Sequence, residues 1–188
     1  FVATRGDDNE QQANNSTETN QPAEPEKPKA PVFDTGKNDH RLIEAQIRRS
    51  LNKPEGELTT EDMAKVKRLE FHKEQISDLS VLKNTPNLDH IDFNYNHISD
   101  LGPLSRLKTL KSAILNRNRI SDLTPLSGLT NLKSLDLYDN QISDLSPLVG
   151  LTQLTTLNLS TNPKLTRAQI DELQKALPNC KITHDTKD

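Results

Sequence analysis

The chain has 188 residues and a net charge of −3, with 24 lysines and arginines against 27 aspartates and glutamates. This length suits one domain, no apolar run reaches the roughly 18 residues of a membrane-spanning helix, and the single cysteine excludes an intramolecular disulfide framework. The segment 1–38 holds seven of the acids and four of the bases, which leaves 20 of each in 39–188. A nucleic-acid partner needs a basic footprint, so this balance argues against one and leaves only a local basic patch open.

The segment 1–38 has the composition of a linker. Between positions 7 and 30 there is no Leu, Ile, Val, Met or aromatic residue, and four prolines recur at three-residue spacing from position 22 to position 31. Such a segment cannot bury enough apolar surface to offset the entropy lost on ordering, so we predict an extended, disordered stalk. The chain begins Phe-Val-Ala rather than with Met, which we interpret as the end of a removed signal or anchor. A propeptide remnant is the alternative.

Two short helices are predicted next. Apolar residues recur at helical spacing between positions 42 and 51, with Asn38 or Asp39 as the N-cap. A second helix begins after Thr59, whose side chain and that of Asp62 have the spacing of a capping box. We expect these helices to cover the end of the segment that follows them.

The stretch from position 66 to about position 165 repeats one 22-residue pattern five times. Three full units begin at Leu88, Leu110 and Leu132. The first unit keeps the frame with Glu74 in place of a recurring asparagine, and the fifth breaks off after Asn162. A fixed period of this length is typical of a solenoid, in which stacking buries the apolar face that no single unit can bury alone.

The pattern L-x-x-L-x-L-x-x-N-x-I-x-D-L-x-P-L resembles that of leucine-rich repeat proteins. The tetrapeptide Ile-Ser-Asp-Leu closely resembles the internalins, a family of bacterial surface proteins, and recurs at Ile76, Ile98, Ile120 and Ile142. We predict an α/β solenoid: a right-handed arc with a parallel β-sheet on its concave face and short helical or 3-10 turns on its convex face. The resemblance implies a helical N-terminal cap and a bacterial source.

Two polar columns in the repeats are predicted to be structural. Four asparagines should bond the backbone of neighbouring units, because buried polar groups need partners: Asn96, Asn118, Asn140 and Asn162. Four aspartates should cap the convex turns: Asp78, Asp100, Asp122 and Asp144. A calcium site in this row is the weaker alternative, since calcium needs several ligands converging on one ion. We expect no metal and no cofactor.

The C-terminal segment predicts one helix and one last strand. Thr166 and Gln169 have capping-box spacing. Cys180 should be buried as a small apolar residue in a strand where it takes the place that Leu157 has in the preceding unit. A reactive thiol beside His184 is the alternative. The chain would then divide into four parts: a linker (1–38), a helical cap (39–65), five repeats (66–165) and a C-terminal cap with tail (166–188).

The concave face is where we expect a partner to bind. Tyr95 and Tyr138, the only tyrosines in the chain, both fall on it. With Ile114 and Arg117 they form the predicted centre, because aromatic residues and arginine are enriched in interface hot spots. The other predicted partner-binding residues are polar: His72, His90, Asp92, Asn94, Asn116, Asp136 and Asp139. The alternative is that a solvated sheet tolerates these side chains without a function.

Catalysis is not expected, and no residue is predicted to be catalytic. The sequence has no phosphate loop, metal-ligand spacing or nucleophile motif, and an open sheet face does not exclude water. A dyad of His90 and Asp92 on one strand, in a carbohydrate-processing enzyme, is kept only as a contrasting class.

The sequence therefore predicts a non-enzymatic module that binds a protein, or alternatively a glycan, outside a bacterial cell. We expect a cell-surface or secreted protein, such as a lipoprotein, that is tethered by its linker and meets the membrane only through a removed N-terminal anchor. We expect a monomer that binds no nucleic acid. The alternative is an intracellular scaffold resembling the phosphatase-regulatory members of the same repeat class.

Overall fold

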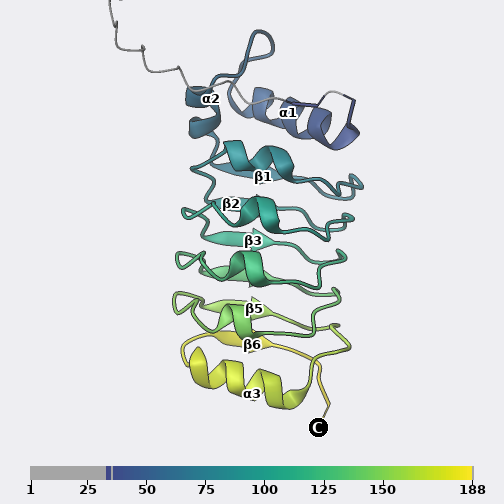
Figure 1. Ribbon diagram of the computed structural model, residues 1–188, viewed down its shortest axis with the longest axis vertical. Coiled ribbons are helices and arrows are strands. Elements are labelled where there is room, and N and C mark those ends of the chain that lie inside the picture. Colours follow the sequence, from purple (N-terminus) through teal and green to yellow (C-terminus); the bar gives the residue numbers. More distant parts are fainter. Residues whose placement is uncertain (1–32, 35, 188) are drawn as a thin grey trace, which may run out of the picture.

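Six parallel strands form one open sheet in which sequence order is also spatial order (Figure 1). The computed structural model describes residues 33–34 and 36–187, so most of the predicted linker lies outside the described residues. The strands are β1 (Arg68–Glu70), β2 (His90–Asp92), β3 (Ser112–Ile114), β4 (Ser134–Asp136), β5 (Thr156–Asn158) and β6 (Lys181–Thr183). The predicted leucine-rich repeat solenoid is confirmed.

The repeat period sets the register of the sheet. From β1 to β5 each strand residue pairs with its equivalent in the next repeat, as Leu69 does with Ile91. The last pair differs, because Leu157 lies opposite Ile182. The predicted equivalence of Leu157 and Cys180 is therefore wrong by two positions. A full helix precedes β6 where the other coils have a short turn, and its length is independent of the repeat.

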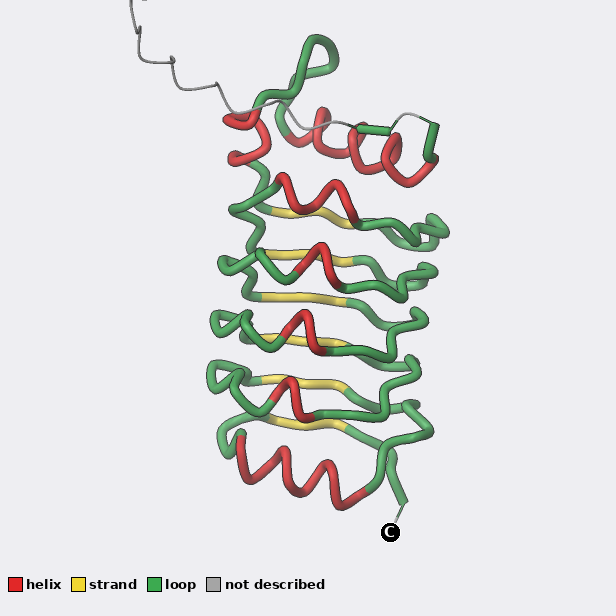
Figure 2. The backbone as a smooth tube through the Cα atoms, in the orientation of Figure 1, coloured by secondary structure: helices red, strands yellow, loops and turns green. Residues whose placement is uncertain are grey.

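Short 3-10 turns cover the other side of the strands, as Figure 2 shows in red against the yellow strands. They are η1 (Ser80–Asn84), η2 (Gly102–Leu104), η3 (Thr124–Leu126) and η4 (Ser146–Leu148). The aspartate two positions before each turn accepts a hydrogen bond from the turn's first backbone N–H, for example from Gly102 to Asp100 at 2.7 Å. The predicted capping role of these aspartates is confirmed.

One continuous apolar core fills the space between strands and turns. Leucine and isoleucine side chains from every coil are buried in it, and Phe71 stacks on Phe93 with ring centroids 5.1 Å apart. Each coil contributes a stripe that only its neighbours can cover, so the core has no centre and extends along the whole stack.

A ladder of buried asparagine amides runs beside this core. The Asn118 side chain accepts a hydrogen bond from the Ile98 N–H at 3.0 Å and donates to the Phe93 carbonyl at 2.9 Å, both in the preceding coil. Asn96, Asn140 and Asn162 repeat this arrangement. These bonds pair backbone groups that the wide turn after each strand would otherwise leave buried and unsatisfied.

Helices α1 (Asn38–Ser50) and α2 (Thr60–Lys65) cover the N-terminal end of the stack. The capping box predicted for Thr59 and Asp62 is confirmed. The N-cap predicted for α1 is wrong, because Lys37 holds that position without a side-chain bond. The carboxylate of Asp39 instead accepts the backbone N–H groups of Ser77 and Asp78, each at 2.8 Å. It therefore joins α1 to the first coil.

Acid is expected to weaken this cap through Asp62. The ammonium group of Lys53 lies 2.6 Å from the carboxylate, and with the Thr59 N–H it holds the pKa of Asp62 well below its ordinary value of 3.8. A carboxyl whose pKa is lowered by folding stabilises the fold above its ordinary pKa, and this contribution is lost as the pH falls toward the folded value.

Thermal unfolding followed by circular dichroism between about pH 5 and pH 2 checks this expectation. The midpoint of Asp62→Asn should fall less steeply with pH than that of the wild type. Glu57→Gln removes a carboxylate nearby in sequence that is exposed, and it should keep the wild-type slope. Parallel curves for Asp62→Asn and the wild type contradict the expectation.

Helix α3 (Arg167–Ala176) and β6 close the other end of the stack. The capping box of Thr166 and Gln169 is confirmed, and Cys180 is buried as predicted. Burial raises the pKa of the Cys180 thiol, which disfavours the reactive thiolate, and His184 bonds Thr186 instead. None of the helices in the described part of the chain is long and apolar enough to cross a bilayer.

Candidate interaction surface

The outer face of the sheet presents four columns of side chains, in which each member comes from the next repeat along the chain. The central strand residues, such as Leu135, point into the core, and the residues on either side of them point outward. The third and fourth columns continue past the strand ends: His72, Asn94, Asn116, Tyr138 and Ser160 form the third, and Lys73, Tyr95, Arg117, Asp139 and Thr161 the fourth. There, backbone bonds such as Tyr95 N–H to the Asn116 carbonyl (3.0 Å) still join adjacent coils. Side chains of consecutive coils are therefore held next to one another.

Four of these side chains form an alternating row of cations and rings, which we call the ring–cation ladder: Lys73, Tyr95, Arg117 and Tyr138. The guanidinium carbon of Arg117 lies 4.5 Å from the centre of the Tyr95 ring and 5.5 Å from that of Tyr138. The Lys73 ammonium lies 5.0 Å from the Tyr95 ring centre. These distances suit cation–π attraction, which contributes about 0.5–1 kcal/mol at an exposed site.

The ladder stands partly on backbone that is unfavourable for its side chains. Lys73, Tyr95, Arg117, Asp139 and Thr161 all have φ between 53° and 60°. This left-handed region costs an ordinary residue about 1–2 kcal/mol, and single asparagines and glycines enter it most readily. The same turn recurs in every coil, and from the second coil on it points the following asparagine inward. The identity of the residue there is not imposed by packing, because Tyr95 is 39% exposed.

The neighbours of Arg117 stabilise the protonated, charged form of its guanidinium group. Tyr138 is the main influence that raises the pKa of the Arg117 guanidinium, and Tyr95 and Asp139 add to it. The Asp139 carboxylate lies 3.7 Å from Arg117 Nε, and both side chains are partly exposed. The guanidinium therefore stays charged while it lies within cation–π distance of both rings.

A second cluster lies on the first two strands. The carboxylate of Asp92 lies 2.9 Å from His72 Nε2, and it accepts the Asn94 N–H. His90 Nε2 lies 3.8 Å from Glu70, whose pKa is lowered mainly by a hydrogen bond from Arg68. Histidines therefore pair with carboxylates of the neighbouring coil.

The structure contradicts one expectation and one contrasting alternative for this cluster. Asp92 was expected as an exposed polar contact, but it is only 8% exposed, because His72 and the flanking strands cover it. The dyad of His90 and Asp92 is also not formed. Alternate residues of one strand are about 6.6 Å apart, whereas adjacent strands are only about 4.8 Å apart, so bonds across coils are favoured.

The remaining predicted residues lie around the ladder. The Asn116 amide donates to Asp136 at 2.9 Å, and the other Asp136 oxygen accepts the Tyr138 N–H. Ile114 is half-buried between Asp92 and Asp136 rather than fully solvent-facing. Lys73 was missed as a site residue, although its position one repeat before Tyr95 was a sufficient signal.

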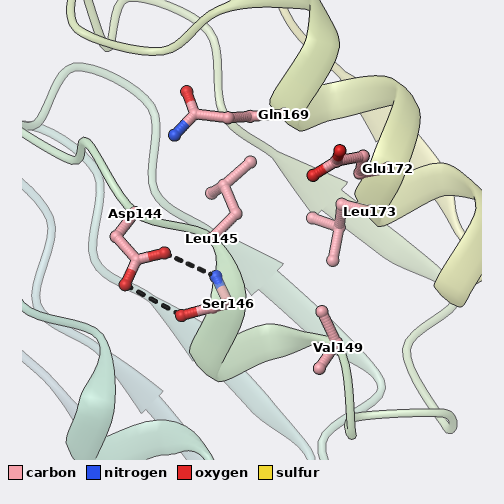
Figure 3. A pocket seen from close by; sticks show the side chains of 7 residues that line it. All are labelled: Asp144, Leu145, Ser146, Val149, Gln169, Glu172 and Leu173. Carbon is pink, nitrogen blue, oxygen red and sulfur yellow. Dashed lines mark hydrogen bonds between the residues drawn. The ribbon is translucent and has the colours of Figure 1, made fainter.

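The hollows in this surface are small and open. One of about 250 Å³ lies over β4 to β6 and includes Asp136 and Lys181 in its lining. A second hollow, of about 200 Å³, lies away from this surface between η4 and α3, where Figure 3 shows Val149 and Glu172 on its walls. Both are below the roughly 300–1,000 Å³ of most ligand pockets. Two larger hollows lie at the ends of the stack and are also open: one of about 450 Å³ beside Arg48 and Pro54, and one of about 380 Å³ beside Thr161 and Asp185. In residues 33–34 and 36–187 no group of three or more His, Cys, Asp or Glu is placed to hold a metal ion.

The comparisons with known proteins agree with this architecture. The family model described as Leucine Rich repeats (2 copies) matches residues 108–149 and 130–175. The crystal structure of an internalin (inlF) from Listeria monocytogenes matches with a TM-score of 0.74 and 30% identity, over 85% of this chain and 47% of that one.

A leucine-rich repeat protein from Leptospira interrogans matches with a TM-score of 0.51 and 19% identity, over 64% of this chain and 38% of that one, and shows the fold alone. The chain thus spans less than half the length of either relative. No curated protein matches the sequence significantly. From its repeats and its likeness to the Listeria structure, the chain is an internalin-like leucine-rich repeat protein.

Proposed function

We propose that the chain is a non-enzymatic binding module, displayed outside a bacterial cell, that recognises a protein partner through the concave face of its sheet. The binding centre is the ring–cation ladder together with Ile114. The polar side chains around it, including His72, Asn116 and Asp139, form the rim. The module acts as a monomer and needs no cofactor.

The main support for this proposal is the backbone position of the side chains in the ring–cation ladder. Tyr95 and Arg117 occupy backbone positions that favour asparagine or glycine, and neither side chain contributes to the core. A cost in stability that packing does not offset is typical of residues kept for function. Tyrosine and arginine are also among the side chains that most often dominate the binding energy of protein interfaces.

Loss of the ladder tyrosines is expected to remove binding without damage to the fold. The repeat supplies a native-like replacement: Asn94 and Asn116 hold the column of Tyr138, and asparagine tolerates the left-handed backbone of Tyr95. The variant Tyr95→Asn/Tyr138→Asn should unfold at the wild-type temperature or above. Val149→Ala is the matched control, because Val149 is the other exposed large apolar residue among the described ones.

Binding is measured on an array of purified secreted proteins and receptor ectodomains, with a glycan array beside it. The wild type and Val149→Ala should bind the same protein, and the double variant should bind it about tenfold more weakly or worse. Equal binding by all three contradicts the assignment of the site. Binding only on the glycan array would replace the protein partner by the glycan alternative.

Display outside the cell rests on the likeness to an internalin and on the composition of the N-terminal segment. Antibody labelling of intact source cells, with protease treatment before lysis, tests it. The chain should be labelled and cleaved on intact cells. Protection until lysis would favour the intracellular scaffold.

A further inference from the structure

Charge is segregated along the strand direction, although the repeat region is nearly neutral as a whole. The segments that lead into the strands (66–68, 83–90, 105–112 and 127–134) contain seven lysines and arginines and one carboxylate, a net charge of +6. The segments that leave them (70–80, 92–102, 114–124 and 136–146) contain nine carboxylates and three lysines and arginines, a net charge of −6. The solenoid therefore has one basic and one acidic edge.

Six exposed side chains form what we call the basic edge: Lys67, Lys83, Arg106, Lys108, Lys111 and Lys133. Over residues 33–34 and 36–187, none of the six takes part in an ion pair. Arg68, the seventh cation, is paired with Glu70. Within this part of the chain, no carboxylate thus lies within ion-pair distance of the basic edge.

The backbone stacks these cations into a row along the solenoid. The N–H of Asp89 donates to the Lys67 carbonyl, that of Lys111 to Asp89 and that of Lys133 to Lys111, at 2.8–2.9 Å. These four residues therefore follow one another at about 4.8 Å per coil. The Lys108 ammonium reaches the Gly128 carbonyl of the next coil at 3.0 Å, which places the loop cations beside the same row.

Like charges directly opposite one another in a sheet are destabilising. Lys111 and Lys133 are such neighbours, and the single acid in the row, Asp89, is half-buried. The arrangement thus opposes stability and leaves a narrow line of positive charge. A line of this kind complements a chain that carries regularly spaced negative groups.

We propose that the basic edge binds a linear acidic polysaccharide laid along the solenoid axis. The basic edge lies where the strands begin, whereas the ring–cation ladder lies where they end. The polysaccharide is therefore a second ligand, distinct from the protein partner proposed for the ladder. Sulfate and carboxylate groups of the polysaccharide pair with the ammonium groups of successive coils.

Other polyanions fit this surface less well. Neither tyrosine lies on the basic edge, so it offers no tyrosine ring on which single-stranded bases could stack. Its six residues lie in loops and in the short 3-10 turn η1, outside the α-helices of the described part of the chain, so it presents no α-helix to the groove of a duplex. Tyr95 and Val149 are the exposed large apolar side chains among the described residues, and neither belongs to the basic edge, so it lacks an apolar anchor for a membrane surface.

The test uses the full chain and a labelled, size-defined heparin octasaccharide, with binding followed by fluorescence anisotropy at low and at physiological salt. The wild type should bind, and more weakly as salt rises. Lys111→Gln/Lys133→Gln should bind roughly tenfold more weakly. Asp89→Asn should bind more tightly, because it removes the only negative charge from the row.

Arg119→Gln/Lys164→Gln is the matched control, since it removes two exposed positive charges outside the basic edge. It should bind as the wild type does, and circular dichroism should show all variants folded. Absence of wild-type binding at low salt overturns the proposal. Equal losses in the two double variants overturn it as well, since only net charge would then matter. Tighter binding to a short DNA duplex, or to vesicles of phosphatidylglycerol, would assign the edge to that class instead.

Discussion

Replacement of Asn118 by leucine is expected to lower the free energy of unfolding by about 3 to 5 kcal/mol. The amide of Asn118 is bonded to the Ile98 N–H and the Phe93 carbonyl, at 3.0 and 2.9 Å, in a part of the molecule that water hardly reaches. A leucine fills similar space but leaves both groups unpaired, and each buried unpaired group costs about 1–3 kcal/mol.

Asn131→Leu is the matched control for this prediction. Asn131 lies at the end of the same repeat as Asn118, but it is exposed and donates a single hydrogen bond, to the Lys108 carbonyl at 2.7 Å. Water can replace that bond, so the free energy of unfolding should fall by only about 1 kcal/mol or less. Urea unfolding followed by circular dichroism measures both values. Similar losses at the two positions would contradict a structural role for the buried ladder.

Replacement of Phe93 by alanine is expected to have an effect of similar size, about 3 to 5 kcal/mol. Phe93 is fully buried and stacks on Phe71 at 5.1 Å, so the change removes both a large apolar surface and a ring contact. The repeat again supplies the control, because Leu115 and Leu137 hold the same position in the next coils. Phe93→Leu should therefore lower the free energy of unfolding much less than Phe93→Ala does.

The distribution of this effect along the chain is a second readout. Coils of a solenoid are coupled mainly to their nearest neighbours, so a cavity at Phe93 should loosen the N-terminal coils first. Hydrogen exchange should become faster in residues 66–104 of Phe93→Ala and change little in residues 130–183. Uniform acceleration would mean that the stack unfolds as one unit.

The fold followed from the sequence because one period determines it. Leucines that recur once in every repeat fix which side chains are inside, and the same step fixes which residues lie opposite each other, as Leu69 and Ile91 do. Where the period ends, prediction became weaker. The offset of β6 depends on the length of α3, and the start of α1 on local contacts of Lys37 and Asp39.

The candidate surface was only partly accessible to the same reasoning. A step of one repeat places Tyr95 next to Arg117, but it gives no side-chain directions. Whether His72 reaches Asp92 across the coils, and so covers it, depends on rotamers that the period does not encode. The basic edge was not predicted, for a different reason. The repeat region has almost no net charge, because the positive charge of one edge and the negative charge of the other cancel in the sum.

The two ladder tyrosines have a spectroscopic consequence. The chain contains no tryptophan and no other tyrosine, so the phenol rings at Tyr95 and Tyr138 account for almost all of its near-ultraviolet emission. Any molecule that docks over these rings changes the quantum yield of the entire protein. Occupancy of this one surface can therefore be followed by unlabelled titration in a cuvette.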